Sequence, residues 1–199
     1  SPFAPTYSTQ YSTSTIGGSG YFGTSNYLTT SSTQIVPAST TYTIEAWIYC
    51  TDTTVGTIFA QGTAGNSGRL SMYIYNGLLY FQIGGTDEGH GAVKANSWNH
   101  VAISVSSGTA SFFVNGVLDN TASGYGTPQN AIAYVGNDWA NTYFPGYISD
   151  LRVSSTARYS SNFTPSTTPL TSDANTRLLC SMTNGAIYDN AEVADYETV

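Results

Sequence analysis

The apolar residues of this chain recur at every second position over short runs, which is the spacing of β-strands. The run 41–50 would place aliphatic residues on one strand face and larger residues on the other, respectively Ile44, Ala46 and Ile48 against Glu45, Trp47 and Tyr49. Similar runs occupy residues 20–28, 98–105, 131–135, 146–153 and 178–180. No segment sustains the apolar period of a helix. The pattern therefore predicts an all-β protein.

The strongest local signal is a hairpin over residues 70–83. Two apolar runs flank Asn76-Gly77, the pair that a type I′ turn prefers because both of its central residues need a positive φ. A two-residue turn fixes the register. One face would then carry the core residues Leu70, Met72, Ile74, Leu79, Phe81 and Ile83, and the other face Ser71, Tyr73, Tyr75, Tyr80 and Gln82. Asn115-Gly116 indicates a second hairpin, between residues 110–114 and 117–118.

Many short strands separated by turns are typical of a β-sandwich or a barrel. We expect one such domain over residues 20–188, preceded by an extended arm or linker over 1–19 and followed by an acidic tail over 189–199. Cys50 and Cys180 lie far apart in the sequence, and we expect two buried thiols rather than a disulfide.

The charge of the chain limits its partners. It has 12 acidic and 5 basic residues, a formal net charge of −7, and the basic residues form no cluster. Binding to nucleic acid or to an anionic membrane surface needs a basic surface, so neither partner is expected. No apolar stretch is long enough to insert into a membrane. Ser, Thr, Asn, Gly and Tyr replace the missing charged residues, a composition common in secreted and virion proteins.

Several short motifs, taken in their order, resemble laminin-G-like domains of the concanavalin-like jelly roll. They cover roughly residues 20–182 and are Gly20-Tyr21-Phe22, Tyr42-Thr43-Ile44-Glu45-Ala46-Trp47, Trp98-Asn99-His100-Val101, Phe113-Val114-Asn115-Gly116, Val135-Gly136-Asn137 and Gly146-Tyr147-Ile148-Ser149-Asp150-Leu151. The resemblance implies a two-sheet antiparallel jelly-roll sandwich of about a dozen strands.

A narrower set of residues resembles laminin-G-like domains in virion and tail-fibre proteins of marine bacteriophages. It consists of Ala157-Arg158-Tyr159, Asn162-Phe163-Thr164-Pro165 and Pro169-Leu170. This resemblance implies an extracellular module on a virion surface that binds host glycans or neighbouring subunits, with a homo-oligomer as one arrangement. The alternative is the carbohydrate-binding domain of a secreted or surface-attached bacterial adhesin.

Two surfaces are candidates for ligand binding. The loop after residue 135 combines aromatic rings with amides and a carboxylate, which suits sugars, and its candidate residues are Asn137, Asp138, Trp139, Asn141 and Tyr143. The polar face of the first hairpin offers Tyr73, Tyr75, Tyr80 and Gln82 as a flat platform. Other roles remain open for both surfaces: Trp139 and Phe144 could cover the end of the core. The tyrosines could stabilise the sheet as cross-strand pairs, or they could pack on a neighbouring subunit.

No cofactor is required by the sequence, and calcium is the one metal to consider. The laminin-G resemblance implies a Ca²⁺ site at the rim of the sandwich, with Asp138 as the best match and Asp87 and Glu88 as candidate partners on another loop. The alternative role for Asp138 is an Asx turn at a strand end.

An enzyme is not expected. A glycoside hydrolase of this fold needs two carboxylates on either side of the scissile bond. Glu45 has no second acid on its face of the predicted strand 41–50, while Asp87, Glu88 and His90 are expected in a glycine-rich loop. His100 is expected to be a structural, hydrogen-bonded residue.

Overall fold

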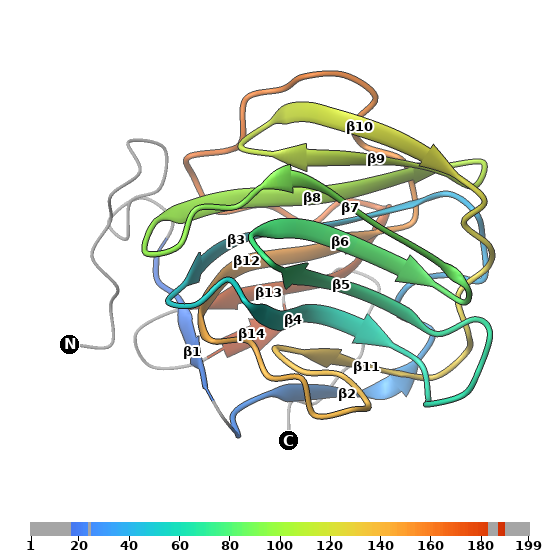
Figure 1. Ribbon diagram of the computed structural model, residues 1–199, viewed down its shortest axis with the longest axis horizontal. Helices are drawn as coiled ribbons and strands as arrows, with labels where there is room; N and C mark the ends of the chain where they lie inside the picture. Colours follow the sequence, from blue (N-terminus) through green and yellow to red (C-terminus); the bar gives the residue numbers. More distant parts are fainter. Residues whose placement is uncertain (1–16, 24, 183–186, 190–199) are drawn as a thin grey trace.

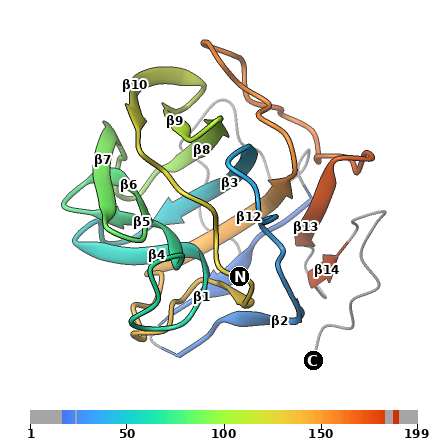
Figure 2. The same cartoon turned by 90° about the vertical axis from the view of Figure 1, so that its right-hand side faces the viewer.

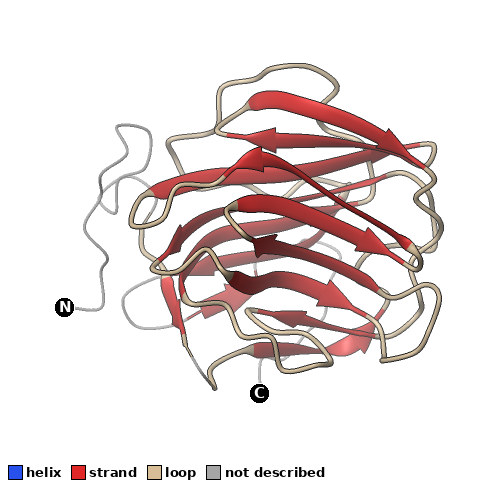
Figure 3. Cartoon of the chain, in the orientation of Figure 1, coloured by secondary structure: helices blue, strands red, loops and turns tan. Residues whose placement is uncertain are grey.

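A computed structural model describes residues 17–23, 25–182 and 187–189, and these residues form fourteen strands and no helix (Figure 3). The strands make two antiparallel sheets that pack on each other (Figures 1 and 2). The expected all-β, two-sheet antiparallel sandwich is therefore confirmed.

The larger sheet has eight strands. They are β1 (Gly20–Phe22), β3 (Tyr42–Cys50), β8 (Trp98–Ser106), β9 (Thr109–Val114), β10 (Val117–Ser123), β12 (Gly146–Ser154), β13 (Thr176–Met182) and β14 (Ile187–Asp189). The spatial order is β10-β9-β8-β3-β12-β13-β14, and β1 also pairs with β12. The central strands β3 and β8 correspond to the predicted strand segments 41–50 and 98–105.

The smaller sheet has six strands, in the order β2-β11-β4-β5-β6-β7. They are β2 (Leu28–Thr33), β4 (Val55–Gln61), β5 (Leu70–Tyr75), β6 (Leu78–Ile83), β7 (Thr86–Ala92) and β11 (Ile132–Val135). Its outer face, formed by β4, β5 and β6, is the one that concerns function.

The predicted hairpin is confirmed in turn and register. Tyr73 lies opposite Tyr80, and Ile74 lies opposite Leu79. Asn76 and Gly77 have φ angles of 47° and 78°, as a type I′ turn requires. The same turn chemistry recurs at Asn115-Gly116 between β9 and β10.

The core lies between the two sheets. The six predicted core residues of the hairpin are all buried in it, together with aliphatic side chains from β3, β8 and β12. Because a one-residue slip would turn every one of these side chains to the outside, the buried face also fixes which residues of β5 and β6 face solvent.

The thiols of Cys50 and Cys180 are both buried and are not bonded to each other, as expected. The part of the chain that the structure describes contains no helix long and apolar enough to cross a membrane. Most of the expected arm and nearly all of the expected acidic tail lie outside the described residues, apart from 17–19 and Asp189, which ends β14.

Candidate functional site

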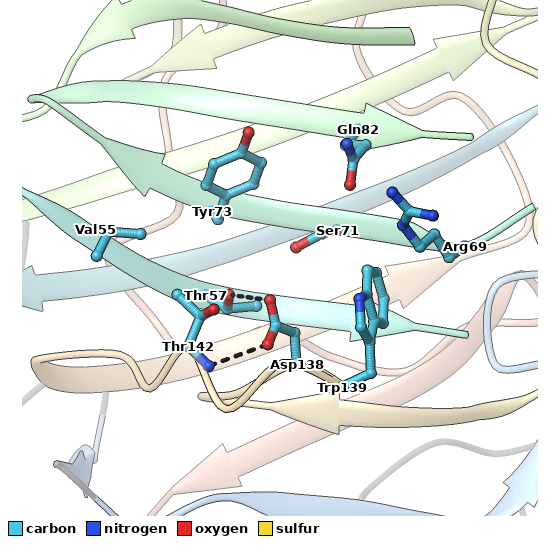
Figure 4. A pocket seen from close by; sticks show the side chains of 9 residues that line it. All are labelled: Val55, Thr57, Arg69, Ser71, Tyr73, Gln82, Asp138, Trp139 and Thr142. Atoms are coloured by element: carbon cyan, nitrogen blue, oxygen red, sulfur yellow. Dashed lines mark hydrogen bonds between the residues drawn. The ribbon is translucent and has the colours of Figure 1, made fainter. Parts of the chain in front are cut away.

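The outer face of the smaller sheet carries a depression of about 160 Å³. Its walls come from strands β4, β5 and β6, from the residue before β5 and from the loop between β11 and β12. The lining side chains are those of Val55, Thr57, Arg69, Ser71, Tyr73, Gln82, Asp138, Trp139 and Thr142. Figure 4 shows Trp139 and Asp138 on one side of the depression and Tyr73 and Gln82 on the other. The two surfaces that the sequence offers as alternatives thus meet in one site.

Asp138 fixes the loop against the sheet. Its Oδ1 accepts hydrogen bonds from the backbone N–H groups of Ala140 and Thr142 at 2.8 and 3.0 Å, and its Oδ2 accepts one from the Thr57 hydroxyl at 3.3 Å. Gly136, at the start of this loop, has a φ of 76°, and a Cβ there would lie 2.1 Å from the Phe22 ring. The Asx-turn role of Asp138 is therefore observed, and it places Trp139 beside the strands.

Trp139 does not cover the core. Phe144, from the same loop, is fully buried in the core, whereas Trp139 is half-buried and lines the depression. The guanidinium carbon of Arg69 lies 5.7 Å from the centre of the Trp139 ring, within range of a cation–π interaction. The alternative that Trp139 and Phe144 cover the end of the core therefore holds for Phe144 only.

Tyr73 is held by a carboxylate from the next strand but one. Its hydroxyl donates to the two carboxylate oxygens of Asp87 at 2.8 and 2.9 Å, and Gln82 Nε2 donates to Asp87 Oδ2 at 3.3 Å. Burial and the neighbouring Asp87 carboxylate raise the pKa of Tyr73, so its hydroxyl stays protonated and donates. Asp87 thus orients two side chains that line the depression.

The other platform tyrosines stand beside the depression rather than in it. The Tyr80 ring centre lies 5.2 Å from that of Tyr73 and 5.6 Å from that of Tyr75. Tyr80 therefore packs against Tyr73 on one side and Tyr75 on the other, which is the cross-strand role that the sequence left open.

The remaining loop candidates also lie outside the depression. Asn137 is buried beneath the loop, and Asn141 is exposed with a φ of 63°. Tyr143 lines a different hollow, on the far part of the same loop.

The sequence misplaces Asp87, Glu88 and His90, which lie in strand β7 and not in a loop. The glycines there serve close packing: a Cβ on Gly89 would lie 2.1 Å from the Tyr80 ring. Gly91 has a φ of 77° where the register between β6 and β7 shifts. A glycine-rich segment thus pairs as an edge strand because its neighbour carries large rings.

The proposed calcium ligands are not brought together. Asp87 and Glu88 are successive residues of β7 and point to opposite faces. Asp87 pairs with Tyr73, and Glu88 pairs with His90 at 3.1 Å. Asp138 uses both oxygens to hold its own loop. Among residues 17–23, 25–182 and 187–189 there is no group of three His, Cys, Asp or Glu side chains that could hold a metal ion.

Arg69, Ser71, Thr57, Val55 and Thr142 are site residues that the sequence did not single out. A signal exists for Ser71, because the hairpin register places it on the same face of β5 as Tyr73. The Ser71 hydroxyl is buried and has no hydrogen-bond partner within the described part of the chain. Ser71 therefore lines the depression, but its hydroxyl oxygen is itself covered.

We expect Asp87→Ala to lower the free energy of unfolding by about 1 kcal/mol, because it removes the acceptor of the Tyr73 hydroxyl at a partly exposed position. The measurement is a double-mutant cycle with Tyr73→Phe by urea denaturation. Tyr73→Phe should lower the free energy of unfolding by about the same amount in the wild-type chain and by almost nothing in the Asp87→Ala chain. Equal costs in both backgrounds would contradict the coupling.

A second polar cluster lies on the outer face of the larger sheet, beneath the segment 155–175. Glu45 on β3 is 1% exposed, and its Oε1 accepts hydrogen bonds from Arg152 Nη2 and Nε at 2.6 and 2.9 Å. Its Oε2 accepts the Tyr159 hydroxyl at 2.7 Å and lies 3.3 Å from His100 Nε2. The expected structural role of His100 fits these contacts.

These contacts keep the Glu45 carboxyl ionised. Burial opposes ionisation, but the hydrogen bond and charge of His100, the charge of Arg152 and the hydrogen bond of Tyr159 outweigh it, and they lower the pKa of Glu45 to about 2. A carboxylate that is ionised, paired and covered in this way offers neither a free oxygen nor a raised pKa for acid–base chemistry.

Comparisons with known proteins agree with this architecture. Residues 22–162 match the laminin-G-type family described as the "Concanavalin A-like lectin/glucanases superfamily". A comparison with curated proteins found no match.

Among solved structures, the chain is similar to a candidate carbohydrate-binding protein of Bacteroides ovatus, with a TM-score of 0.66, 22% identity and coverage of 88% of this chain and 56% of that one. It is similar to domain 4 of the extracellular arabinanase AbnA of Geobacillus stearothermophilus, solved in complex with arabinotriose, with a TM-score of 0.58, 21% identity and coverage of 69% and 70%. It is also similar to domains LG4-5 of the mouse laminin α1 chain, with a TM-score of 0.55, 16% identity and coverage of 77% of this chain and 47% of that one. At these identities the likeness shows the fold, and the match spans only about half of the Bacteroides and laminin chains.

Proposed function

Because the chain belongs to the concanavalin A-like lectin/glucanases superfamily, we propose that it is a non-catalytic glycan-binding module whose site is the depression between Trp139 and Tyr73. The observation that carries the proposal is the composition of this depression. A half-buried indole ring stands beside hydrogen-bonding groups of Arg69 and Gln82. Sugars present C–H faces that pack on aromatic rings and hydroxyls that pair with such groups.

The comparisons support the proposal by analogy. The Bacteroides relative is a candidate carbohydrate-binding protein, and the arabinanase domain was solved with arabinotriose. Both share the fold of this chain, and fold alone does not transfer a ligand. The proposal therefore rests on the residues of the depression.

The non-catalytic part of the proposal rests on how the carboxylates are used. Asp138 and Asp87 flank the depression, but their oxygens accept hydrogen bonds that hold the loop and Tyr73. Glu45 lies on the larger sheet, away from the depression, and is paired there with Arg152. Hydrolysis would need a carboxylic acid and a carboxylate directed at one bond. Release of sugar from a bound oligosaccharide would contradict this part.

We place the module outside the cell, first on a virion surface and alternatively on a bacterial adhesin. The support is the composition, poor in charge and rich in hydroxyls and amides, together with the phage-like motifs at residues 157–170. Its partners would be host glycans or neighbouring subunits, copies of this chain included. Detection of the chain by mass spectrometry in purified particles or in a washed cell-surface fraction separates the two locations.

A glycan array tests the proposal, with Trp139→Ala as the decisive variant. We expect Trp139→Ala to weaken binding about thirtyfold, or about 2 kcal/mol, because the loss of an aromatic anchor at the centre of a site costs this much. The affinity measured with a chelator should equal the affinity measured with calcium, because both carboxylate oxygens of Asp138 already accept hydrogen bonds from the loop and from Thr57.

Trp139→Phe, which keeps an aromatic face, is the matched control and should retain most of the binding. Unchanged melting temperatures would show that both variants fold. An array on which the wild-type chain binds no glycan would refute the glycan-binding proposal and favour a role in subunit assembly.

A further inference from the structure

A second hollow, of about 250 Å³, lies next to the first. One wall is formed by Tyr21 of β1, by Gly23 directly after β1, and by Thr51. The other wall is the last part of the loop before β12, namely Tyr143, Phe144 and Pro145. Strand β1 reaches this place because Phe22 pairs with Gly146, directly after the loop. Sequence reasoning selected only Tyr143 among these residues.

The hollow has the chemistry of a sugar site. Tyr21 is 57% exposed, and its ring packs against Tyr147 with 5.1 Å between the ring centres. Gly23 leaves room for this ring, since a Cβ there would lie 3.0 Å from the Tyr21 hydroxyl. Tyr143 is supported in the same way by Tyr27, at 6.1 Å. Two supported rings therefore flank the hollow, and both carry hydroxyls at their outer ends.

The two hollows share a wall. Thr142 lines the depression on the sheet and Tyr143 lines the second hollow. Their Cα atoms are neighbours in the chain and so lie about 3.8 Å apart. The segment 51–55 repeats this arrangement, because Thr51 lines one hollow and Val55 the other. Both of these segments are held in place: Asp138 bonds the loop to Thr57, and the Thr51 hydroxyl donates to the Pro145 carbonyl at 2.9 Å.

We infer that the second hollow is a further subsite for the same glycan, so that the module binds an extended oligosaccharide across the loop rather than a single terminal sugar. The inference rests on the proposed function of the depression. A chain bound at Trp139 would present its next rings to Tyr143 and Tyr21 at a high effective concentration, and each added contact would then raise the affinity. A glycan too short to cross the loop would gain nothing from the second hollow.

The test compares sugars of increasing length on wild-type and variant proteins. Series of arabinose, xylose, glucose and sialic acid, each from the monosaccharide to the hexasaccharide, are bound to the wild-type chain, to Tyr21→Ala and to Tyr143→Ala. We expect the affinity of the wild-type chain to rise with length within at least one series. Each alanine variant should lower the affinity for the longest sugar of that series about tenfold, which corresponds to roughly 1.4 kcal/mol. The affinity for the shortest sugar that binds should stay unchanged.

Tyr21→Phe and Tyr143→Phe keep the rings and serve as matched controls that should retain the gain with length. Two separate positions keep the test valid if one variant fails to fold, which thermal unfolding would reveal. Affinity that does not rise with length, or a rise that survives both alanine variants, would overturn the inference while leaving the site at Trp139 intact. No binding by the wild-type chain to these series or to any glycan of the array would instead refute the proposed function, and the inference with it.

Discussion

Replacing Glu45 with alanine is expected to lower the free energy of unfolding by about 3–5 kcal/mol, because it leaves a buried guanidinium without its partner. Arg152 is itself buried, and Glu45 accepts two of its hydrogen bonds. The change also removes the acceptor of the Tyr159 hydroxyl. Tyr159 stacks on Phe163 with ring centres 3.7 Å apart, so the segment 155–175 would lose contacts with the sheet as well.

Urea denaturation at neutral pH measures this cost, and Glu88→Ala is the matched control. Glu88 also pairs with a histidine, but the pair is partly exposed, and such pairs contribute at most about 1 kcal/mol. If Glu45→Ala does not fold, Glu45→Gln keeps the shape and one acceptor and should fall between wild type and alanine. A cost for Glu45→Ala no larger than that for Glu88→Ala would show that the buried pair does not stabilise the fold.

The fold was largely predictable because its signals are local. Alternation marks the segments that form strands, although β3 and β8 are buried on both faces. Asn76-Gly77 and Asn115-Gly116 fix the register of two hairpins through backbone preferences alone. The strand pairings that close the sandwich, such as β1 with β12, join residues more than a hundred positions apart. No short-range pattern specifies such pairings.

The candidate site was predictable in its residue types but not in its assembly. Trp139, Asp138, Tyr73 and Gln82 were each identified, but on two separate surfaces. Their meeting depends on the pairing of β11 with β4, which places the loop after β11 beside the hairpin. Arg69 was missed because a charged residue at the end of a glycine-rich loop gives no signal until Trp139 is placed next to it.

Strand β7 and the Glu45 cluster were missed for a related reason. The glycines of β7 suggest a loop unless the ring that packs on Gly89 is known. Glu45 appears isolated because Arg152 and Tyr159 are 107 and 114 residues away in sequence. Compensation of a buried charge is a property of the tertiary structure, so sequence spacing could not supply it.

Asp150→Asn is expected to stabilise the protein at neutral pH by an amount on the order of 2–3 kcal/mol. Asp150 is 3% exposed, and burial together with the nearby charge of Glu45 raises its pKa to about 6, against the opposing effects of the Leu170 N–H group, Arg152 and His100. A raised carboxyl pKa means that the folded chain binds the proton more tightly than the unfolded chain. The stability due to Asp150 is therefore complete below about pH 4 and is lost as the pH rises through about 6.

Asparagine mimics the protonated carboxyl at every pH. Asp150 has a φ of 53°, a region that asparagine adopts readily, and its Oδ2 accepts the Leu170 N–H at 2.8 Å, a bond that an amide oxygen can also accept. Unfolding free energies measured by urea denaturation from pH 4 to 7 should therefore fall less in Asp150→Asn than in the wild-type chain. The two chains should converge towards pH 4.

Asp173→Asn provides a control of opposite sign. The hydrogen bond from Arg158 to Asp173, at 2.8 Å, lowers the pKa of that carboxyl, so its ionised form stabilises the fold at neutral pH. Asp173→Asn should then destabilise the protein at pH 7 and matter less as the pH falls. If Asp150→Asn were destabilising at pH 7 as well, the Asp150 carboxylate would be a favourable partner within the cluster, and burial would not be the dominant effect on its charge.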